Sequence, residues 1–134
     1  MEDFVSFEIA KKLKDKGFPQ SPYYVNYSSY YEWDGLRKIN SLCNASVWFD
    51  TNISKDNLYF APTISQVLDW LRRENEIDIA INPIIKYDDN LNRIREYSCD
   101  IFAPQLNKPY CTSYYDSYEQ ASLVGIEYVL NNLI

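Results

Sequence analysis

The 134-residue sequence predicts an α+β fold in which three helices pack on an antiparallel meander of three strands. Three capping signals, each followed by apolar residues at helical spacing, predict the helices, and alternating apolar residues after the second helix predict the sheet. The expected helices span residues of about 6–17, 63–75 and 117–132. The expected strands span residues of about 77–86, 94–103 and 110–114. Because the length fits one domain and no linker interrupts the chain, residues 1–134 are expected to form a single domain.

The helix starts carry the side chains that satisfy free backbone N–H groups. Ser6 is a favourable N-cap for the first helix, and Gly17 is suited to the left-handed conformation that ends one. The second and third helices open on capping boxes, with a hydroxyl residue three positions before a glutamine, at 63–66 and 117–120. The third helix is apolar around most of its circumference, which predicts that it packs on several sides.

The strand signals are clearest after the second helix. Ile77, Ile79 and Ile81 alternate with less apolar residues, as in a half-buried strand, and residues 87–92 form a polar hairpin loop. Alternation over 94–103 is only partial, and a short strand at 110–114 would complete the meander. Segments with high strand propensity within residues 22–61 indicate extra short strands, and the pattern leaves open whether they join the main sheet.

The absence of histidine excludes several chemistries. It removes the usual general base at neutral pH, the Ser-His-Asp and Cys-His arrangements, and the commonest zinc ligand beside cysteine. Cys43, Cys99 and Cys111 lie too far apart for metal-ligand spacing, so no cofactor or metal is expected. An odd number of cysteines without a secretory signal favours free thiols in a reducing cytoplasm. A contact between Cys99 and Cys111 across neighbouring strands stays open as an alternative.

Charge and hydropathy bound the location and the partners. The acidic N-terminus lacks the basic start and apolar run of a signal peptide, and no segment approaches the ~20 apolar residues of a membrane span. The expected location is therefore the cytoplasm, without membrane association. Nineteen acidic residues outnumber thirteen basic ones, for a net charge of −6, which argues against binding to a phosphate backbone. No nucleic-acid partner is expected.

Acidic and amide residues at alternate positions resemble the opening of a calcium loop. Asp88, Asn90 and Asn92 have this spacing, as do polar residues over 50–56, but neither run has the Gly and Glu that an EF-hand loop requires. Turn residues that hydrogen-bond to the backbone are the favoured interpretation. The neighbouring acids Glu32 with Asp34, and Glu74 with Glu76, leave a carboxylate hydrolase as a weak alternative because no signature surrounds them.

Tyrosine is the one residue type in marked excess. Nine of the thirteen tyrosines fall in two windows of the sequence. These candidate binding residues are Tyr23, Tyr24, Tyr27, Tyr30 and Tyr31 in the first window and Tyr110, Tyr114, Tyr115 and Tyr118 in the second. Tyrosine offers a large contact area with a polar tip, so both windows on one face would form a binding patch. Codon bias combined with ordinary strand propensity is the favoured explanation of the excess itself.

Three segments together resemble a family of short uncharacterised proteins from gut anaerobic bacteria and their phages or mobile elements. The matching pieces are residues 5–18, 61–72 and 117–121, followed by Gly125, Ile126 and Leu130. With the strand around residues 77–81 they cover about half of the chain, in the order that the family shows. The resemblance implies an α+β domain without an assigned activity, and it provides no catalytic residues.

These observations favour a small non-enzymatic protein that binds another protein, as an accessory protein of a phage or mobile element. The alternatives are an acidic inhibitor of a nucleic-acid enzyme and the carboxylate-dependent hydrolase. Neither the partner nor the oligomeric state follows from the sequence.

Overall fold

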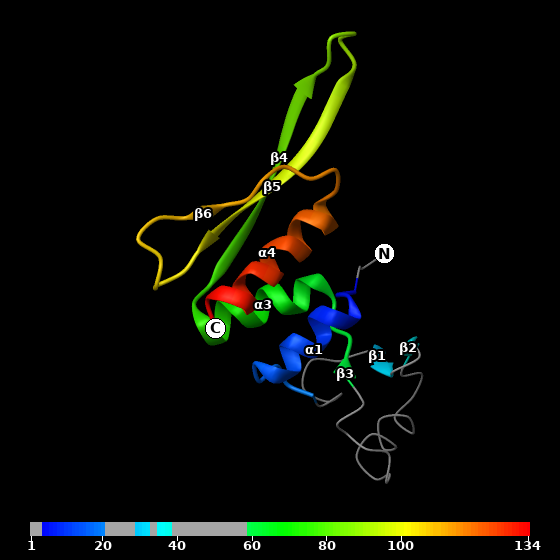
Figure 1. Ribbon diagram of the computed structural model, residues 1–134, viewed down its shortest axis with the longest axis vertical. Helices are drawn as coiled ribbons and strands as arrows, with labels where there is room; N and C mark the ends of the chain where they lie inside the picture. The colour runs from blue at the N-terminus through cyan, green and yellow to red at the C-terminus, as the bar shows by residue number, and fades with distance from the viewer. Residues whose placement is uncertain (1–3, 21–28, 33–34, 39–58) are drawn as a thin grey trace. The chain divides into compact units, whose positions relative to one another are not determined.

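The computed structural model describes residues 4–20, 29–32, 35–38 and 59–134, and it confirms the α+β class (Figure 1). The described helices are α1 (Phe7–Asp15), α3 (Ile64–Asn75) and α4 (Tyr118–Asn132). The chain divides into two compact units, residues 1–66 and 67–134, with the boundary inside α3. A single domain over residues 1–134 stays a prediction, and each unit is described by itself below.

The first unit contains a small antiparallel sheet in the order β2-β1-β3. Its strands are β1 (Ser29–Glu32), β2 (Gly35–Lys38) and β3 (Tyr59–Phe60). Helix α1 contacts β3, and the Phe7 and Tyr59 rings meet edge to face with centroids 5.5 Å apart. The extra strands expected within 22–61 thus form a sheet separate from β4-β5-β6, while the segments 22–28 and 46–49 lie outside the described residues.

The second unit contains the predicted meander, in the order β4-β5-β6. Its strands are β4 (Asp78–Tyr87), β5 (Arg93–Phe102) and β6 (Tyr110–Cys111). Strand β6 is shorter than the expected 110–114 because the Thr112 hydroxyl, rather than a backbone carbonyl, accepts from the Cys99 backbone N–H (2.9 Å). Regular pairing stops there, and an isolated bridge joins Tyr97 to Tyr115 further along β5.

The predicted capping contacts are present at all three helices. The Ser6 hydroxyl accepts from the Ile9 backbone N–H, and the Ser117 hydroxyl accepts from that of Gln120 (3.0 Å). After α1, Gly17 takes a φ of 90°, the left-handed conformation expected of it.

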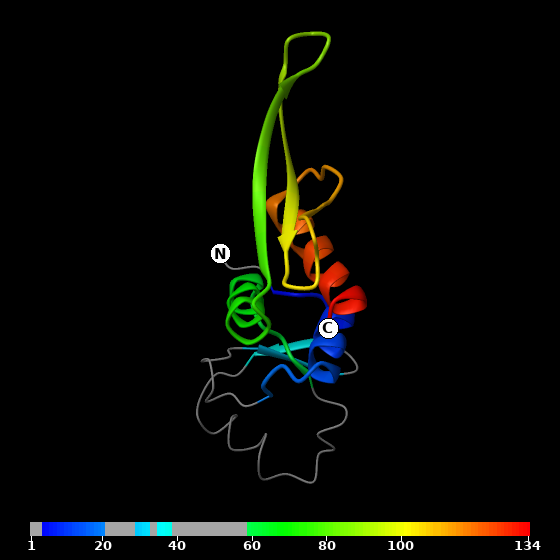
Figure 2. The same cartoon turned by 90° about the vertical axis from the view of Figure 1, so that its left-hand side faces the viewer.

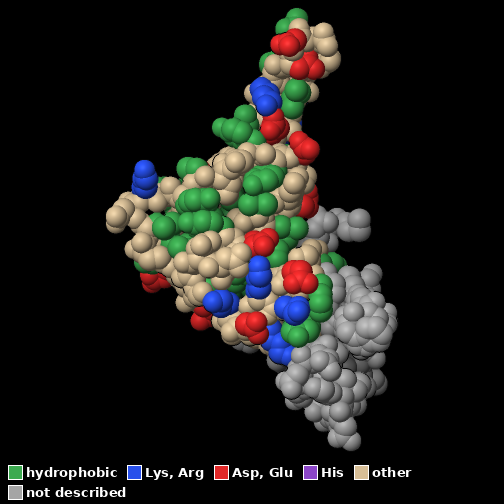
Figure 3. Space-filling model, viewed as in Figure 1, with side chains coloured by type: hydrophobic (Ala, Val, Ile, Leu, Met, Phe, Trp, Pro, Cys, Tyr) green, Lys and Arg blue, Asp and Glu red, His purple; other side chains and the backbone are tan. Residues whose placement is uncertain are grey.

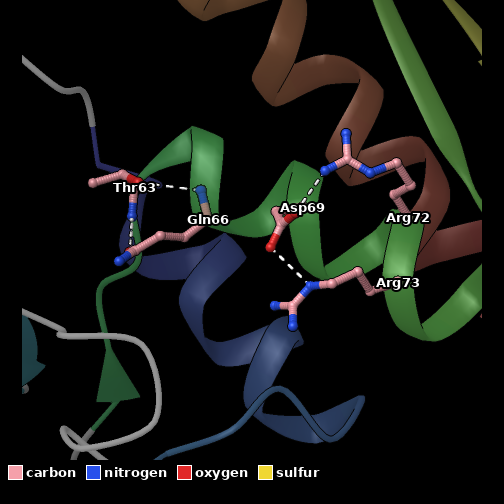
Figure 4. Close-up of polar contacts among 5 residues, drawn as sticks. All are labelled: Thr63, Gln66, Asp69, Arg72 and Arg73. Atoms are coloured by element: carbon pink, nitrogen blue, oxygen red, sulfur yellow. Dashed lines mark hydrogen bonds and ion pairs between the residues drawn. The ribbon is translucent and has the colours of Figure 1, made fainter.

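The capping box of α3 is reciprocal (Figure 4). The Gln66 N–H donates to the Thr63 hydroxyl (3.2 Å), and the Thr63 N–H donates to the Gln66 side-chain oxygen (2.8 Å). One turn later Asp69 forms ion pairs with Arg72 (2.6 Å) and Arg73 (2.8 Å). These pairs are exposed, so their contribution to stability is small.

Helix α4 packs on one side of the β4–β5 hairpin (Figures 1 and 2). Its buried residues form a stripe at helical spacing, consisting of Ala121, Ser122, Gly125, Ile126, Val129 and Leu130. Gly125 lies at the closest approach, where a Cβ atom would stand 2.8 Å from Cys99 Sγ and 3.2 Å from Ile79 Cγ2. The lack of a side chain therefore sets how near the helix axis comes to the sheet.

Replacing Gly125 with alanine tests this close packing. Overpacking costs about 1–3 kcal/mol and better helix propensity returns about 1 kcal/mol, so Gly125→Ala should lower the free energy of unfolding by roughly 1 kcal/mol. Because Cys99 Sγ is the nearest atom, Cys99→Ala should recover part of that loss when both substitutions are combined. Chemical denaturation of both single variants and the double variant measures this coupling. Additive effects of the two substitutions would contradict the close-approach explanation.

Candidate functional site

The β4–β5 hairpin, called the arm below, has two different faces. Ten residue pairs from Asp78 with Phe102 to Tyr87 with Arg93 set the register, and side chains alternate between the faces. The face that α4 covers, called the α4 face, carries Ile79, Ile81, Pro83, Ile85 and Tyr87 on β4 and Arg93, Arg95, Tyr97, Cys99 and Ile101 on β5. The opposite side, called the far face, carries the residues between them. Function can therefore differ between the two sides.

Helix α4 covers only part of the α4 face, and the arm continues past the first turn of the helix (Figure 1). Cys99 and Ile101 are completely buried, whereas Ile85 is 48% exposed and Tyr87 is 66% exposed. Tyr97 marks the limit of the covered part, because its ring meets the ring of Tyr118, the first residue of α4, edge to face (centroids 6.2 Å apart). The apolar side chains of β4 on the α4 face thus continue beyond the part of the sheet that the helix covers.

Large apolar side chains are exposed mainly on the arm and beside it. Every strongly exposed one with a described side chain lies between residues 85 and 118, namely Ile85, Tyr87, Leu91, Phe102, Tyr110, Tyr114 and Tyr118. Figure 3 shows hydrophobic side chains on the visible side of the second unit and along the arm, among charged side chains of both signs. Such a concentration is typical of an interaction surface.

The structure places the second tyrosine window around the arm, but not on one face. Tyr115 pairs with Tyr97 and so belongs to the α4 face, on which Tyr118 also packs. Tyr110 stacks on Tyr128 of α4 with ring centroids 3.8 Å apart. Tyr114, the neighbour of Tyr115, therefore lies on the far face. There it interacts electrostatically with Lys86, which contributes to the raised pKa of that lysine. The window therefore surrounds the place where α4 meets the sheet.

The described residues do not test whether the first tyrosine window shares this surface. Tyr23, Tyr24 and Tyr27 lie outside the described residues. Tyr30 and Tyr31 belong to β1 in the first unit, and only their backbone pairing is described. A patch shared by both windows stays a prediction. Sequence reasoning missed Ile85, Tyr87 and Leu91, although the alternation of the predicted hairpin was the available signal for the first two.

Charges on the far face of the arm are mostly paired. Lys86 forms an ion pair with Glu96 across the strands, which raises the pKa of the lysine. The Asn82 amide donates to Asp100 (2.9 Å). These contacts match the register, since each joins residues that are directly opposite or diagonal on one face.

The free edge of β4 carries an interruption. Tyr97 exchanges both backbone hydrogen bonds with Tyr115 (2.8 and 2.7 Å), so the polar backbone groups of its partner Pro83 point to the outer edge of β4. No described strand pairs with that edge. Proline has no N–H, so the outward row of donors is broken in the middle of the strand. This arrangement protects the edge against pairing with another strand.

The turn at the tip of the arm is held by one carboxylate. Asp88 accepts from the backbone N–H groups of Asn90 (2.9 Å) and Asn92 (2.8 Å) and from the Asn92 amide. The hydrogen bond from the Asn92 backbone is the largest cause that lowers the pKa of Asp88. This confirms turn chemistry for the spacing that resembles a calcium loop, while residues 50–56 lie outside the described part.

Leu91 occupies an unfavourable place in the same turn. Its φ is 64°, in the left-handed region that costs a non-glycine residue on the order of 1 kcal/mol. Its side chain is 82% exposed, so no packing within the described residues compensates. Asparagine or glycine would adopt this conformation with less strain.

The described cysteines are free and lie on opposite faces of the sheet. Cys99 belongs to the α4 face, whereas Cys111 pairs with Asp100 and so belongs to the far face. The bridge between them, left open by the sequence, is therefore not formed. Burial raises the pKa of Cys99, and the hydrogen bond with Asp100 raises that of Cys111. Both groups are held as neutral thiols, which are weak nucleophiles.

The described acidic pair considered for catalysis, Glu74 and Glu76, does not form an enclosed site. Glu74 and Glu76 are both exposed, and the side chains of Glu32 and Asp34 lie outside the described part. No group of three potential metal ligands occurs among the described residues. No helix in the same part of the chain has the length and apolar character needed to cross a membrane.

Comparison with known proteins gives no match for this chain. No family model, no curated protein and no solved structure matches it.

Restoring the missing donor of Pro83 tests the role of the β4 edge. Pro83→Thr adds an outward N–H, and one or two new intermolecular hydrogen bonds of about 1 kcal/mol each should tighten self-association about 5- to 30-fold. Sedimentation velocity over a concentration series measures the change. Adding Ile85→Pro to the same chain moves the interruption one outward position along and should reverse the effect. Identical association of Pro83→Thr and the wild type would contradict edge protection.

The lowered pKa of Asp88 predicts a pH-dependent tip. Because the folded state holds this pKa below its ordinary value of 3.8, the contribution of the carboxylate to stability is present above that pH and is lost as the pH falls through the folded pKa. The amide resonances of Asn90 and Asn92 should shift in NMR spectra with a midpoint below 3.8. Asp88→Asn should abolish the titration. A midpoint at or above the ordinary value would show that the hydrogen bonds do not favour the charged form.

Proposed function

We propose that this chain is a non-enzymatic protein-interaction module that binds another protein through the arm and the aromatic residues beside it. The observation that carries the proposal is the concentration of exposed apolar side chains between residues 85 and 118. Water is removed from such side chains when a partner covers them, which favours association. The remainder of the unit serves to hold the arm.

The residue types on this surface support binding to a protein. Tyr87, Tyr114 and Tyr118 provide large areas with few rotatable bonds, and tyrosine and arginine are enriched where interfaces gain most of their binding energy. Arg95 lies over the ring of Tyr97 (5.3 Å to the centroid), so an arginine and an aromatic residue are already held together. These features suit a specific interface better than general solubility.

The strained tip supports the same conclusion. Leu91 takes a costly backbone conformation and exposes 82% of its apolar side chain, although a polar or smaller residue would be cheaper in both respects. A contact with a partner supplies the missing reason, since burial of a leucine contributes about 1.5–3 kcal/mol. We infer that the tip is part of the contact surface.

The chemistry of the titratable groups favours binding over catalysis. Both described thiols have raised pKa values, and the described acid pair Glu74 and Glu76 is solvent-exposed. Two carboxyl groups that act together in hydrolysis flank one enclosed site, which these two solvent-exposed side chains do not form. The hydrolase alternative and the inhibitor of a nucleic-acid enzyme have no comparable observation in their favour.

A cytoplasmic location and an origin in a phage or mobile element are part of the proposal. The free thiols among the described residues and the resemblance to proteins of gut bacteria and their phages are what support them. The genes that neighbour the coding sequence test the origin directly.

Site-specific photo-cross-linking tests the proposed surface. A photoreactive phenylalanine analogue replaces Tyr87 or Tyr118 in the full chain, and the control positions are the exposed Asn131 on α4 and Glu74 on α3. Irradiation in the organism that encodes the protein should give the same cross-linked protein from Tyr87 and Tyr118 and none from the controls. Mass spectrometry identifies the product. Equal labelling from the controls, labelling only between copies of this chain, or no product would each contradict the proposal.

A further inference from the structure

The part of the α4 face beyond the helix combines apolar and cationic side chains. Arg95 lies opposite Ile85, and Arg93 lies opposite Tyr87, so two arginines stand beside two exposed apolar residues on one side of the sheet. These four residues are called the distal α4 face below. Each cross-strand pair thus places a guanidinium group beside an exposed apolar side chain, whose burial by a partner would be favourable.

The two arginines have no acidic partner among the described residues, unlike Lys86, the other cation of the arm. Lys86 is neutralised by Glu96 on the far face, and Asp88 is engaged by the backbone of the turn. Asp116 and Glu119, near the start of α4, form no ion pair with either arginine. Arg95 lies over the ring of Tyr97, and a guanidinium stacked on an aromatic ring can still donate to a carboxylate. The distal α4 face is therefore locally positive in a chain of net charge −6.

The geometry favours docking on the face rather than along the edge. Pro83 removes one outward donor from the middle of β4, which disfavours the addition of a strand. The same sheet face already accepts a helix in its proximal half, where α4 packs against Cys99 and Ile79. A second helix laid on the distal half would continue that layer and cover Ile85 and Tyr87.

We propose that the distal α4 face binds an acidic amphipathic helix of the partner protein. This inference rests on the proposed function and names the chemistry of the partner. Apolar side chains of that helix would pack on Ile85 and Tyr87, and its carboxylates would pair with Arg93 and Arg95. A nucleic acid suits the surface less well, because the exposed Asp89 lies at the tip and the whole chain is acidic.

Selection from a peptide library shows which residue types the distal α4 face binds, even though the partner protein is not identified. A displayed library of 18-residue helical peptides, with apolar residues at positions i, i+3, i+4 and i+7 and all other positions randomised, is panned against the full chain. Selected peptides are then measured by fluorescence anisotropy against R93E/R95E, against R93Q/R95Q and against K16E/K108E. The last variant carries the same net charge change as the first on exposed lysines elsewhere. A labelled 15-nucleotide oligouridine serves as the nucleic-acid probe.

The inference expects selected peptides rich in Asp and Glu that bind at least tenfold more weakly to R93E/R95E, several-fold more weakly to R93Q/R95Q and unchanged to K16E/K108E. Retained edge-to-face contacts between Tyr97 and Tyr118 in NMR spectra show that each variant is folded. Neutral or basic binders, binding insensitive to Arg93 and Arg95, the absence of binders, or arginine-dependent binding of oligouridine would overturn it. If cross-linking from Tyr87 and Tyr118 still captures a protein partner in those cases, the proposed function stands and only the acidic helix is wrong.

Discussion

The register between β4 and β5 is the constraint on which the second unit depends. Ten successive pairs place every odd-numbered residue of the arm on the α4 face and every even-numbered one on the far face. A shift of one residue would exchange the two sets, and α4 would meet Ala80 and Asp100 in place of Ile79 and Cys99. The turn held by Asp88 and the contact at Gly125 act at opposite ends of this ladder. They therefore stabilise the same alignment from two sides.

The length of the arm exceeds the length that α4 covers, and this mismatch creates the proposed interaction surface. If folding alone determined the sequence, the uncovered residues of the α4 face would be polar, because exposed apolar residues in a strand add little to stability. Ile85 and Tyr87 instead continue the apolar pattern of Ile79 and Ile81. The pattern breaks on β5, where Arg93 and Arg95 replace apolar residues. The distal α4 face thus combines two apolar residues, as in a core, with two charged residues, as on a surface. Such a mixture is typical of a docking site that is covered only part of the time.

The features that depend on residues close in sequence, such as the helix starts, could be predicted from the sequence. Each capping contact joins residues three positions apart, so Ser6, Thr63 and Ser117 identified the helix starts directly. Non-local relations were less accessible. Whether Cys111 faces Cys99 depends on a single step of register with β5, and the pairing with Asp100 places it on the other side. The exposure of Ile85 and Tyr87 depends on where α4 begins relative to the sheet, which no spacing within the hairpin reveals. Whether tyrosines close in sequence share one surface was left open by the sequence, and Tyr114 and Tyr115 alternate between faces.

Protection of the edge and exposure of the face are two parts of one arrangement. A hairpin with an uncovered apolar face and an open edge is prone to pair with copies of itself, because both backbone and side chains gain from association. Pro83 weakens pairing along the edge without altering the face, since its outward-pointing nitrogen was not needed for pairing with β5. Arg93 and Arg95 act on the face itself, because two copies laid face to face would bring uncompensated guanidinium groups together. Pairing with identical arms is thus opposed in both directions, while a partner that brings carboxylates to the apolar face meets neither obstacle.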